Sequence, residues 1–297
     1  MRPLKVAAGL VFCLMRDGPN VKGGSIVFVL SGFADEISPE LEEQLDVLTS
    51  LDIEHLELRG VWGQNVLELA DAQVADIKQA LEDRGMGVSA IGSPIGKIGI
   101  DDPMEPHLEA FRRALDLAEA FETPYIRMFS FYVPEGQADA CRDEVMRRLA
   151  ALLEEADGRP VTLLHENESR IYGDIPRRCL DILETIDSPQ LQMTFDPANF
   201  VMNDVHPYDD AFDMLADHIG YLHIKDGIMA EKRVVPAGEG DGQVKQILQA
   251  LHDRGFEGFA SLEPHLAHAG AFAGFSGPEL FGVAAKALRK LLKEVEG

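Results

Sequence analysis

The 297-residue chain has few cysteines, few basic residues and no long apolar run. Its three cysteines, Cys13, Cys141 and Cys179, lack C-x-x-C spacing, which argues against a disulfide scaffold or a structural zinc site and fits a reducing compartment. Only 27 lysines and arginines stand against 51 acidic residues, giving a formal net charge of −24. Because nucleic acids and anionic membranes bind basic patches, neither is an expected partner. No apolar run approaches the roughly 18 to 20 residues that span a bilayer. We therefore expect a cytoplasmic protein.

Residues 1–24 are expected to lie outside the folded domain. Arg2 and Lys5 precede the short apolar run Val6–Met15, which faintly resembles a signal peptide, but no clear small-residue cleavage site follows. The segment is interpreted as an N-terminal extension that is disordered or outside the barrel, with a targeting segment as the alternative. Residues 25–297 would form the domain.

Eight short apolar runs alternate with eight helical patterns along the rest of the chain. Alternation of this kind requires parallel strands with crossover helices, and eight repeats close a (β/α)8 barrel. The alternative, an open doubly wound sheet, is disfavoured because no glycine-rich phosphate loop follows the first run. We predict an α/β protein with a single (β/α)8 TIM barrel, whose strands are the runs Ile26–Leu30, His55–Leu58, Val88–Ile91, Tyr125–Phe129, Val161–His165, Leu191–Phe195, Ile219–Leu222 and Phe259–Leu262.

Each of the last four apolar runs is followed directly by a residue that can bind a metal. These residues are Glu166, Asp196, His223 and Glu263. Because the carboxyl ends of parallel strands converge on one crevice, the four side chains are expected to lie together. Three carboxylates and one imidazole form an oxygen-rich set, which suits Mn²⁺ or Mg²⁺, with Co²⁺ or Zn²⁺ as alternatives.

The motifs around these residues resemble the sugar phosphate isomerase/epimerase family, the xylose isomerase-like TIM barrels. The resemblance covers Ile26 to the C-terminus, and its most specific parts are LLHEN, FDPANF, YLHIKD, VPAGEGD and SLEPH. It implies that Glu166, Asp196, His223 and Glu263 bind one divalent ion. It also implies that Glu166 and Glu263 are catalytic, transferring protons on a sugar or polyol substrate through a metal-stabilised enediolate. A homodimer or homotetramer is the implied assembly.

Five further residues are candidates for substrate binding. Arg233 lies in KRVVP, which resembles the family's Arg-x-x-Pro stretch, and Lys225 lies in HIKD. Asn199 stands where ketose 3-epimerases usually carry a histidine, and this departure puts free-ketose epimerisation in doubt. His165 and Arg59 complete the set. Each has a structural alternative: His165 would point away from Glu166 in a strand and pack in the core, and Arg59 would pack a loop.

Three other functions remain open. A dehydratase or lyase of the same barrel class, similar to inosose dehydratase, would use the same metal site and then expel a hydroxyl group. A metal hydrolase similar to endonuclease IV would need several more histidines at strand ends and a basic surface for DNA. A non-catalytic sugar-binding barrel would be expected to lose a metal ligand or both glutamates, and this chain keeps all four.

Overall fold

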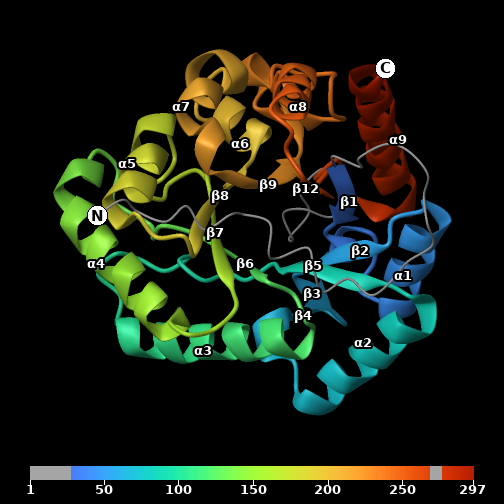
Figure 1. The fold of residues 1–297 in the computed structure, drawn as a ribbon, viewed down its shortest axis with the longest axis horizontal. Coiled ribbons are helices and arrows are strands. Elements are labelled where there is room, and N and C mark those ends of the chain that lie inside the picture. The colour runs from blue at the N-terminus through green and yellow to red at the C-terminus, as the bar shows by residue number, and fades with distance from the viewer. Residues whose placement is uncertain (1–27, 268–275) are drawn as a thin grey trace, which may run out of the picture.

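The computed structural model describes residues 28–267 and 276–297, in which eight parallel strands form a nearly closed barrel inside a ring of helices (Figure 1). The strands follow the order β1-β12-β9-β8-β7-β6-β5-β2, and a parallel bridge between Phe33 and Glu57 brings the two end strands together. The predicted TIM barrel is confirmed. Its strands are β1 (Phe28–Gly32), β2 (His55–Leu58), β5 (Gly87–Ile91), β6 (Tyr125–Met128), β7 (Thr162–Glu166), β8 (Leu191–Phe195), β9 (Ile219–Ile224) and β12 (Gly258–Leu262).

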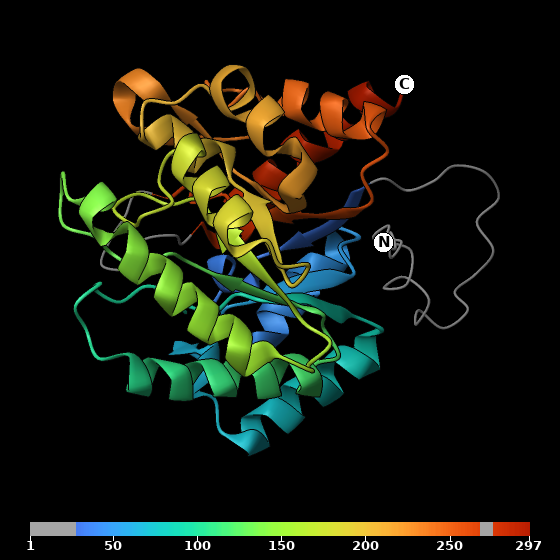
Figure 2. The same ribbon diagram turned by 60° about the vertical axis from the view of Figure 1, so that its left-hand side comes forward.

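The helices surround the strands (Figure 1), and Figure 2 shows the same arrangement after a turn of 60°. The longer helices bury an apolar stripe against the barrel. In α9 the stripe includes Phe281, whose ring lies so close to Gly32 of β1 that a Cβ there would come within 2.7 Å of it. The helices are α1 (Leu41–Ser50), α2 (Asp71–Arg84), α3 (Met104–Ala120), α4 (Ala138–Ala156), α5 (Pro176–Ile186), α6 (Pro197–Met202), α7 (Asp213–Leu215), α8 (Val244–Asp253) and α9 (Gly277–Glu296).

The strand register decides which side chains face the barrel interior. Glu166 pairs with Thr194, and Thr194 pairs with Tyr221, so these three residues lie on one face of the sheet. His223, two residues after Tyr221, shares that face. The Tyr221 hydroxyl hydrogen-bonds to Ser89 at 2.8 Å inside the barrel, so a buried polar layer lies beneath the strand ends.

Some elements differ from the sequence prediction. Glu166 and His223 lie within β7 and β9, because both strands continue past the apolar run. Part of the segment after β9 forms an antiparallel hairpin of β10 (Asp226–Ile228) and β11 (Arg233–Val235), which the eight predicted strands do not include. A second hairpin, β3 (Gly60–Val61) with β4 (Gln64–Asn65), follows β2.

The predicted extension, residues 1–24, lies outside the described residues, so the domain boundary stays a prediction. Within the described ranges, none of the helices has the length and apolar character that crossing a membrane requires.

Candidate metal centre

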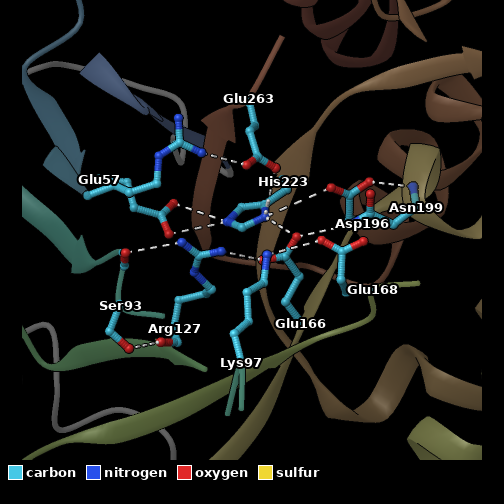
Figure 3. A network of polar contacts seen from close by, with 12 residues as sticks. Glu57, Ser93, Lys97, Arg127, Glu166, Glu168, Asp196, Asn199, His223 and Glu263 are labelled. Atoms are coloured by element: carbon cyan, nitrogen blue, oxygen red, sulfur yellow. Dashed lines mark hydrogen bonds and ion pairs between the residues drawn. The ribbon is translucent and has the colours of Figure 1, made fainter. Parts of the chain in front are cut away.

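Glu166, Asp196, His223 and Glu263 come together at the carboxyl end of the barrel (Figure 3). One ligand atom from each lies within 4.8 Å of the others, and all four side chains are buried. His223 Nδ1 is 3.2 Å from Glu166 Oε1, 3.7 Å from Glu263 Oε2 and 4.0 Å from Asp196 Oδ2. The four residues come from four neighbouring barrel strands. Glu166 lies in β7 and His223 in β9, whereas Asp196 caps α6 directly after β8 and Glu263 directly follows β12.

Glu57 of β2 orients the histidine. Its carboxylate oxygens lie 3.1 and 3.3 Å from His223 Nε2, and both side chains are fully buried. With the proton of Nε2 donated to Glu57, Nδ1 faces the carboxylate of Glu166 and has no hydrogen-bond partner. Although burial opposes protonation, Glu57 and Glu166 raise the pKa of His223. This corner of the cluster therefore attracts a positive charge, which a proton or a metal ion can supply.

The donor set and its spacing fit a divalent ion. Neighbouring ligands of an octahedral ion bound at about 2.1 Å lie about 3 Å apart, and opposite ligands lie about 4 Å apart. The three distances from His223 Nδ1, 3.2, 3.7 and 4.0 Å, span this range. Three carboxylates beside one imidazole favour Mg²⁺ or Mn²⁺ over ions that prefer thiolate.

Arg127 and Asn199 fix both oxygens of Glu166. The Arg127 guanidinium donates to Oε2 at 3.0 Å, and the Asn199 amide donates to Oε1 at 3.0 Å. Burial alone would raise the pKa of Glu166, but the positive charges of His223 and Arg127 outweigh it and hold the pKa at about 2. Glu166 is therefore an ionised carboxylate with a fixed orientation.

Arg59 holds Glu263 in a similar way. Its guanidinium donates to Glu263 Oε1 at 3.0 Å and to Asp35 at 2.7 Å. Burial would raise the pKa of Glu263, but Lys225 and His265 lower it well below its usual range. The guanidinium carbons of Arg59 and Arg127 lie 4.4 and 5.3 Å from the centre of the same buried ring, Phe33. Each glutamate thus keeps one oxygen toward the cluster while an arginine binds the other.

A second group of ligand-type side chains adjoins the first and shares Glu263. His265 Nε2 lies 3.1 Å from Glu36 and 3.3 Å from Glu263. The other oxygen of Glu36 accepts hydrogen bonds from the Ser276 hydroxyl and from the backbone N–H of His265. These contacts tie the segment after β12 to the 3-10 helix η2 (Ala34–Glu36), so the group supports the position of Glu263.

The structure brings three of the five candidate substrate-binding residues to the cluster and leaves two away from it. Asn199 contacts Glu166, Arg59 contacts Glu263, and Lys225 contacts Asp196 and Glu263 at 2.9 Å each. His165 faces the other side of β7, fully buried against Gly173. Arg233, the exposed first residue of β11 in the β10–β11 hairpin, pairs with Glu231. The substrate-binding roles of His165 and Arg233 stay predictions without a supporting contact.

Two residues of the cluster were missing from the predicted site. Arg127 sits in the strand Tyr125–Met128, and Glu57 sits in His55–Leu58. A charged residue inside a short apolar strand is itself a signal, because burial of an unpaired charge is costly and such a residue needs a partner. The sequence does not say which partner it has.

Comparisons with known proteins place the chain in a family. A family model described as xylose isomerase-like TIM barrel matches residues 45–293, whereas a search of curated proteins gives no significant match. One solved structure with this fold is a D-tagatose 3-epimerase-like protein (TM-score 0.73, 16% identity, covering 90% of this chain and 98% of that one).

Two others are similar in fold. One is a probable 3-DHS dehydratase from Bacillus anthracis (TM-score 0.68, 20% identity, covering 88% of this chain and 98% of that one). The other is a xylose isomerase-like TIM barrel protein from Mycobacterium smegmatis in complex with magnesium (TM-score 0.68, 16% identity, 92% and 98% covered). At these identities the three structures show the fold alone. The match to the family model shows that the chain belongs to the xylose isomerase-like TIM barrel family.

Proposed function

We propose that this protein is a divalent-metal-dependent isomerase or epimerase of a sugar, sugar phosphate or related polyol, working through an enediolate of the substrate. The observation that carries the proposal is the convergence of Glu166, Asp196, His223 and Glu263 at the carboxyl end of the barrel. In TIM-barrel enzymes this end holds the active site. Mg²⁺ and Mn²⁺ are the preferred ions for this donor set, ahead of Co²⁺ and Zn²⁺.

The four side chains would hold the ion, and Glu57 would keep the His223 ring in the required tautomer. When bound, the ion supplies a positive charge that polarises a substrate carbonyl group. That polarisation makes a proton on the adjacent carbon easier to remove. The site therefore needs a base placed next to the cluster.

Glu166 and Glu263 are the proposed proton-transfer groups. Nearby positive groups lower the pKa of both, so both are ionised and able to accept a proton at neutral pH. Arg127 and Arg59 bind the outer oxygens of the two carboxylates and limit their rotation. Two bases would allow one to remove a proton from one face of the substrate and the other to return a proton to the opposite face, which is epimerisation. A single base that returns the proton to the neighbouring carbon would give isomerisation.

A dehydratase of the same barrel class is the second candidate, because Asn199 disfavours free-ketose 3-epimerisation. Where ketose 3-epimerases usually carry a histidine, the Asn199 amide donates to Glu166 Oε1 at 3.0 Å and cannot transfer a proton. The fold is also similar to that of a probable 3-DHS dehydratase. Such an enzyme would remove the same kind of proton and then expel a β-hydroxyl group.

The test is solvent exchange followed by NMR in D₂O with the Mg²⁺-loaded protein and a panel of hydroxy-ketones. We expect deuterium to enter the carbon next to the carbonyl with the wild type and not with Glu263→Gln. Product analysis then separates an epimer or isomer from a dehydrated product.

Glu168→Gln is the matched control, since Glu168 pairs with Lys97 at 3.3 Å and lies outside the four-residue ligand set. Exchange should continue in this variant. Absence of exchange with every hydroxy-ketone, in a protein that binds the metal, would refute the isomerase and epimerase proposal.

A further inference from the structure

Lys225 is a buried lysine that contacts two of the four candidate metal ligands. It follows β9, and its residue is only 5% exposed. The ammonium nitrogen lies 2.9 Å from Asp196 Oδ2 and 2.9 Å from Glu263 Oε2. These two oxygens are also the ones that face His223 Nδ1 at the centre of the cluster. An ammonium group and a divalent ion would therefore bind the same two atoms.

The other cations of the site bind elsewhere. Arg127 takes the outer oxygen of Glu166, and Arg59 takes the outer oxygen of Glu263. Among the ammonium and guanidinium groups of the described residues, only that of Lys225 contacts ligand oxygens that face His223 Nδ1, here called the inner oxygens. Because buried carboxylates are costly without a positive partner, this ammonium stabilises the cluster.

The position of Lys225 is fixed by the next residue. The carboxylate of Asp226 accepts four backbone N–H groups, from Gly227 at 2.7 Å, Gly238 at 2.8 Å, Gly240 at 3.1 Å and Gly242 at 2.7 Å. This anchor ties the strand end to the loop before α8. Lys225 therefore extends into the cluster from a backbone with little freedom to move.

We propose that Lys225 sets the metal affinity of the site by competing with the ion for the inner oxygens of Asp196 and Glu263. The inference rests on the proposed metal site. Lys225 is a positioning residue here. In the metal-free protein it keeps the two carboxylates together, and during metal binding its positive charge opposes the positive charge of the ion. Removing the charge makes the site more negative, so it raises the affinity for metal and lowers the stability of the metal-free protein.

The experiment measures Mn²⁺ binding by calorimetry on full-length protein first treated with a chelator. The variants are Lys225→Met, Lys225→Gln and Lys97→Met. Lys97 is the matched control, because it pairs with Glu168 (Figure 3) and is about 31% exposed in its side chain. We expect Mn²⁺ affinity to rise by about tenfold or more in both Lys225 variants, because they remove a positive charge that opposes the ion at two of its ligand oxygens. We expect a change of less than about threefold in Lys97→Met.

Thermal unfolding supplies a second readout. In the presence of chelator, Lys225→Met should unfold at a lower temperature than the wild type, and Mn²⁺ should raise its unfolding temperature by more than it does for the wild type. Lys225→Gln keeps a hydrogen-bond donor without the charge, so it tests the electrostatic argument even if Lys225→Met folds poorly.

The outcomes separate the two proposals. Weaker or unchanged Mn²⁺ binding in the Lys225 variants overturns the competition, and weaker binding would make Lys225 a support of the ligand carboxylates. Failure of the wild type and of all variants to bind Mn²⁺, Mg²⁺, Co²⁺ or Zn²⁺ overturns the metal site itself.

Discussion

Glu57→Gln is expected to weaken metal binding without unfolding the protein. The Glu57 carboxylate lies 3.1 Å from His223 Nε2, and neither side chain is exposed. The negative charge holds the proton on Nε2 and leaves the Nδ1 lone pair facing the other ligands. Glutamine has nearly the same size but no charge. Its amide oxygen can accept the hydrogen bond from Nε2, or its NH₂ group can turn toward the ring instead.

The expected loss follows from the change in hydrogen bond. A bond to a charged group contributes about 1.5 to 3 kcal/mol, and a neutral bond contributes about 0.5 to 1.5 kcal/mol. The midpoints of the two ranges differ by about 1.25 kcal/mol, which corresponds to roughly an eightfold loss of affinity. This is close to the lower end of the losses of about 10- to 100-fold that mutation of partners of metal-bound histidines causes.

Calorimetric titration of Mn²⁺ into chelator-treated wild type and Glu57→Gln measures this loss. Glu168→Gln, which removes a charge from the Lys97 pair, is the control and should bind like the wild type. If Glu57→Gln folds normally and its affinity lies within about twofold of the wild type, Glu57 does not orient the ring and the reasoning is wrong.

Two further predictions concern stability. Asp226→Asn replaces a carboxylate that accepts four backbone N–H groups with an amide whose NH₂ group faces some of them. We expect the free energy of unfolding in urea to fall by about 3 to 5 kcal/mol and hydrogen exchange at Gly238–Gly242 to become faster. Unaltered exchange would contradict the role of Asp226 as an anchor. Burial, with help from Arg148, lowers the pKa of His107 from 6.5 to about 4, while His107 Nε2 accepts the Gly96 N–H at 2.8 Å. The unfolded chain therefore takes up this proton first, so the contribution of His107 is complete above pH 6.5 and falls toward pH 4, by about 1 to 2 kcal/mol at pH 5. His107→Gln, which keeps an acceptor, should lose less stability than the wild type between pH 7.5 and pH 5, and equal losses in urea unfolding would refute the assignment.

Much of the barrel could be predicted from the sequence because each strand is a short apolar run between helical patterns. Two predicted strands, His55–Leu58 and Leu191–Phe195, have the bounds that the structure gives. The four candidate ligands could be grouped for a geometric reason, since parallel strands bring their carboxyl ends to one side of the barrel. Their metal binding stays a proposal.

The partners of the ligands could not be predicted, because they depend on register and side-chain direction. The pairing of β2 with β5 shifts between Leu56 and Glu57, and no sequence pattern locates such a shift. Arg127 pairs with Glu166 although 39 residues separate them. The motif similarity around Arg233 did not predict the hairpin in which this exposed residue lies, since that hairpin depends on contacts of its own backbone.

The glycine-rich segment VPAGEGD has a consequence for ligand screening. Clustered backbone N–H groups of this kind commonly bind phosphate or other small anions. Here the anion is part of the chain, since the Asp226 carboxylate occupies the N–H groups of Gly238, Gly240 and Gly242. A tethered group has an effective concentration of at least millimolar order, which a dissolved anion must exceed to replace it. Phosphate titrated into the protein should therefore leave these three amide resonances unchanged, and the glycine-rich segment of this chain is poor evidence for a phosphorylated substrate.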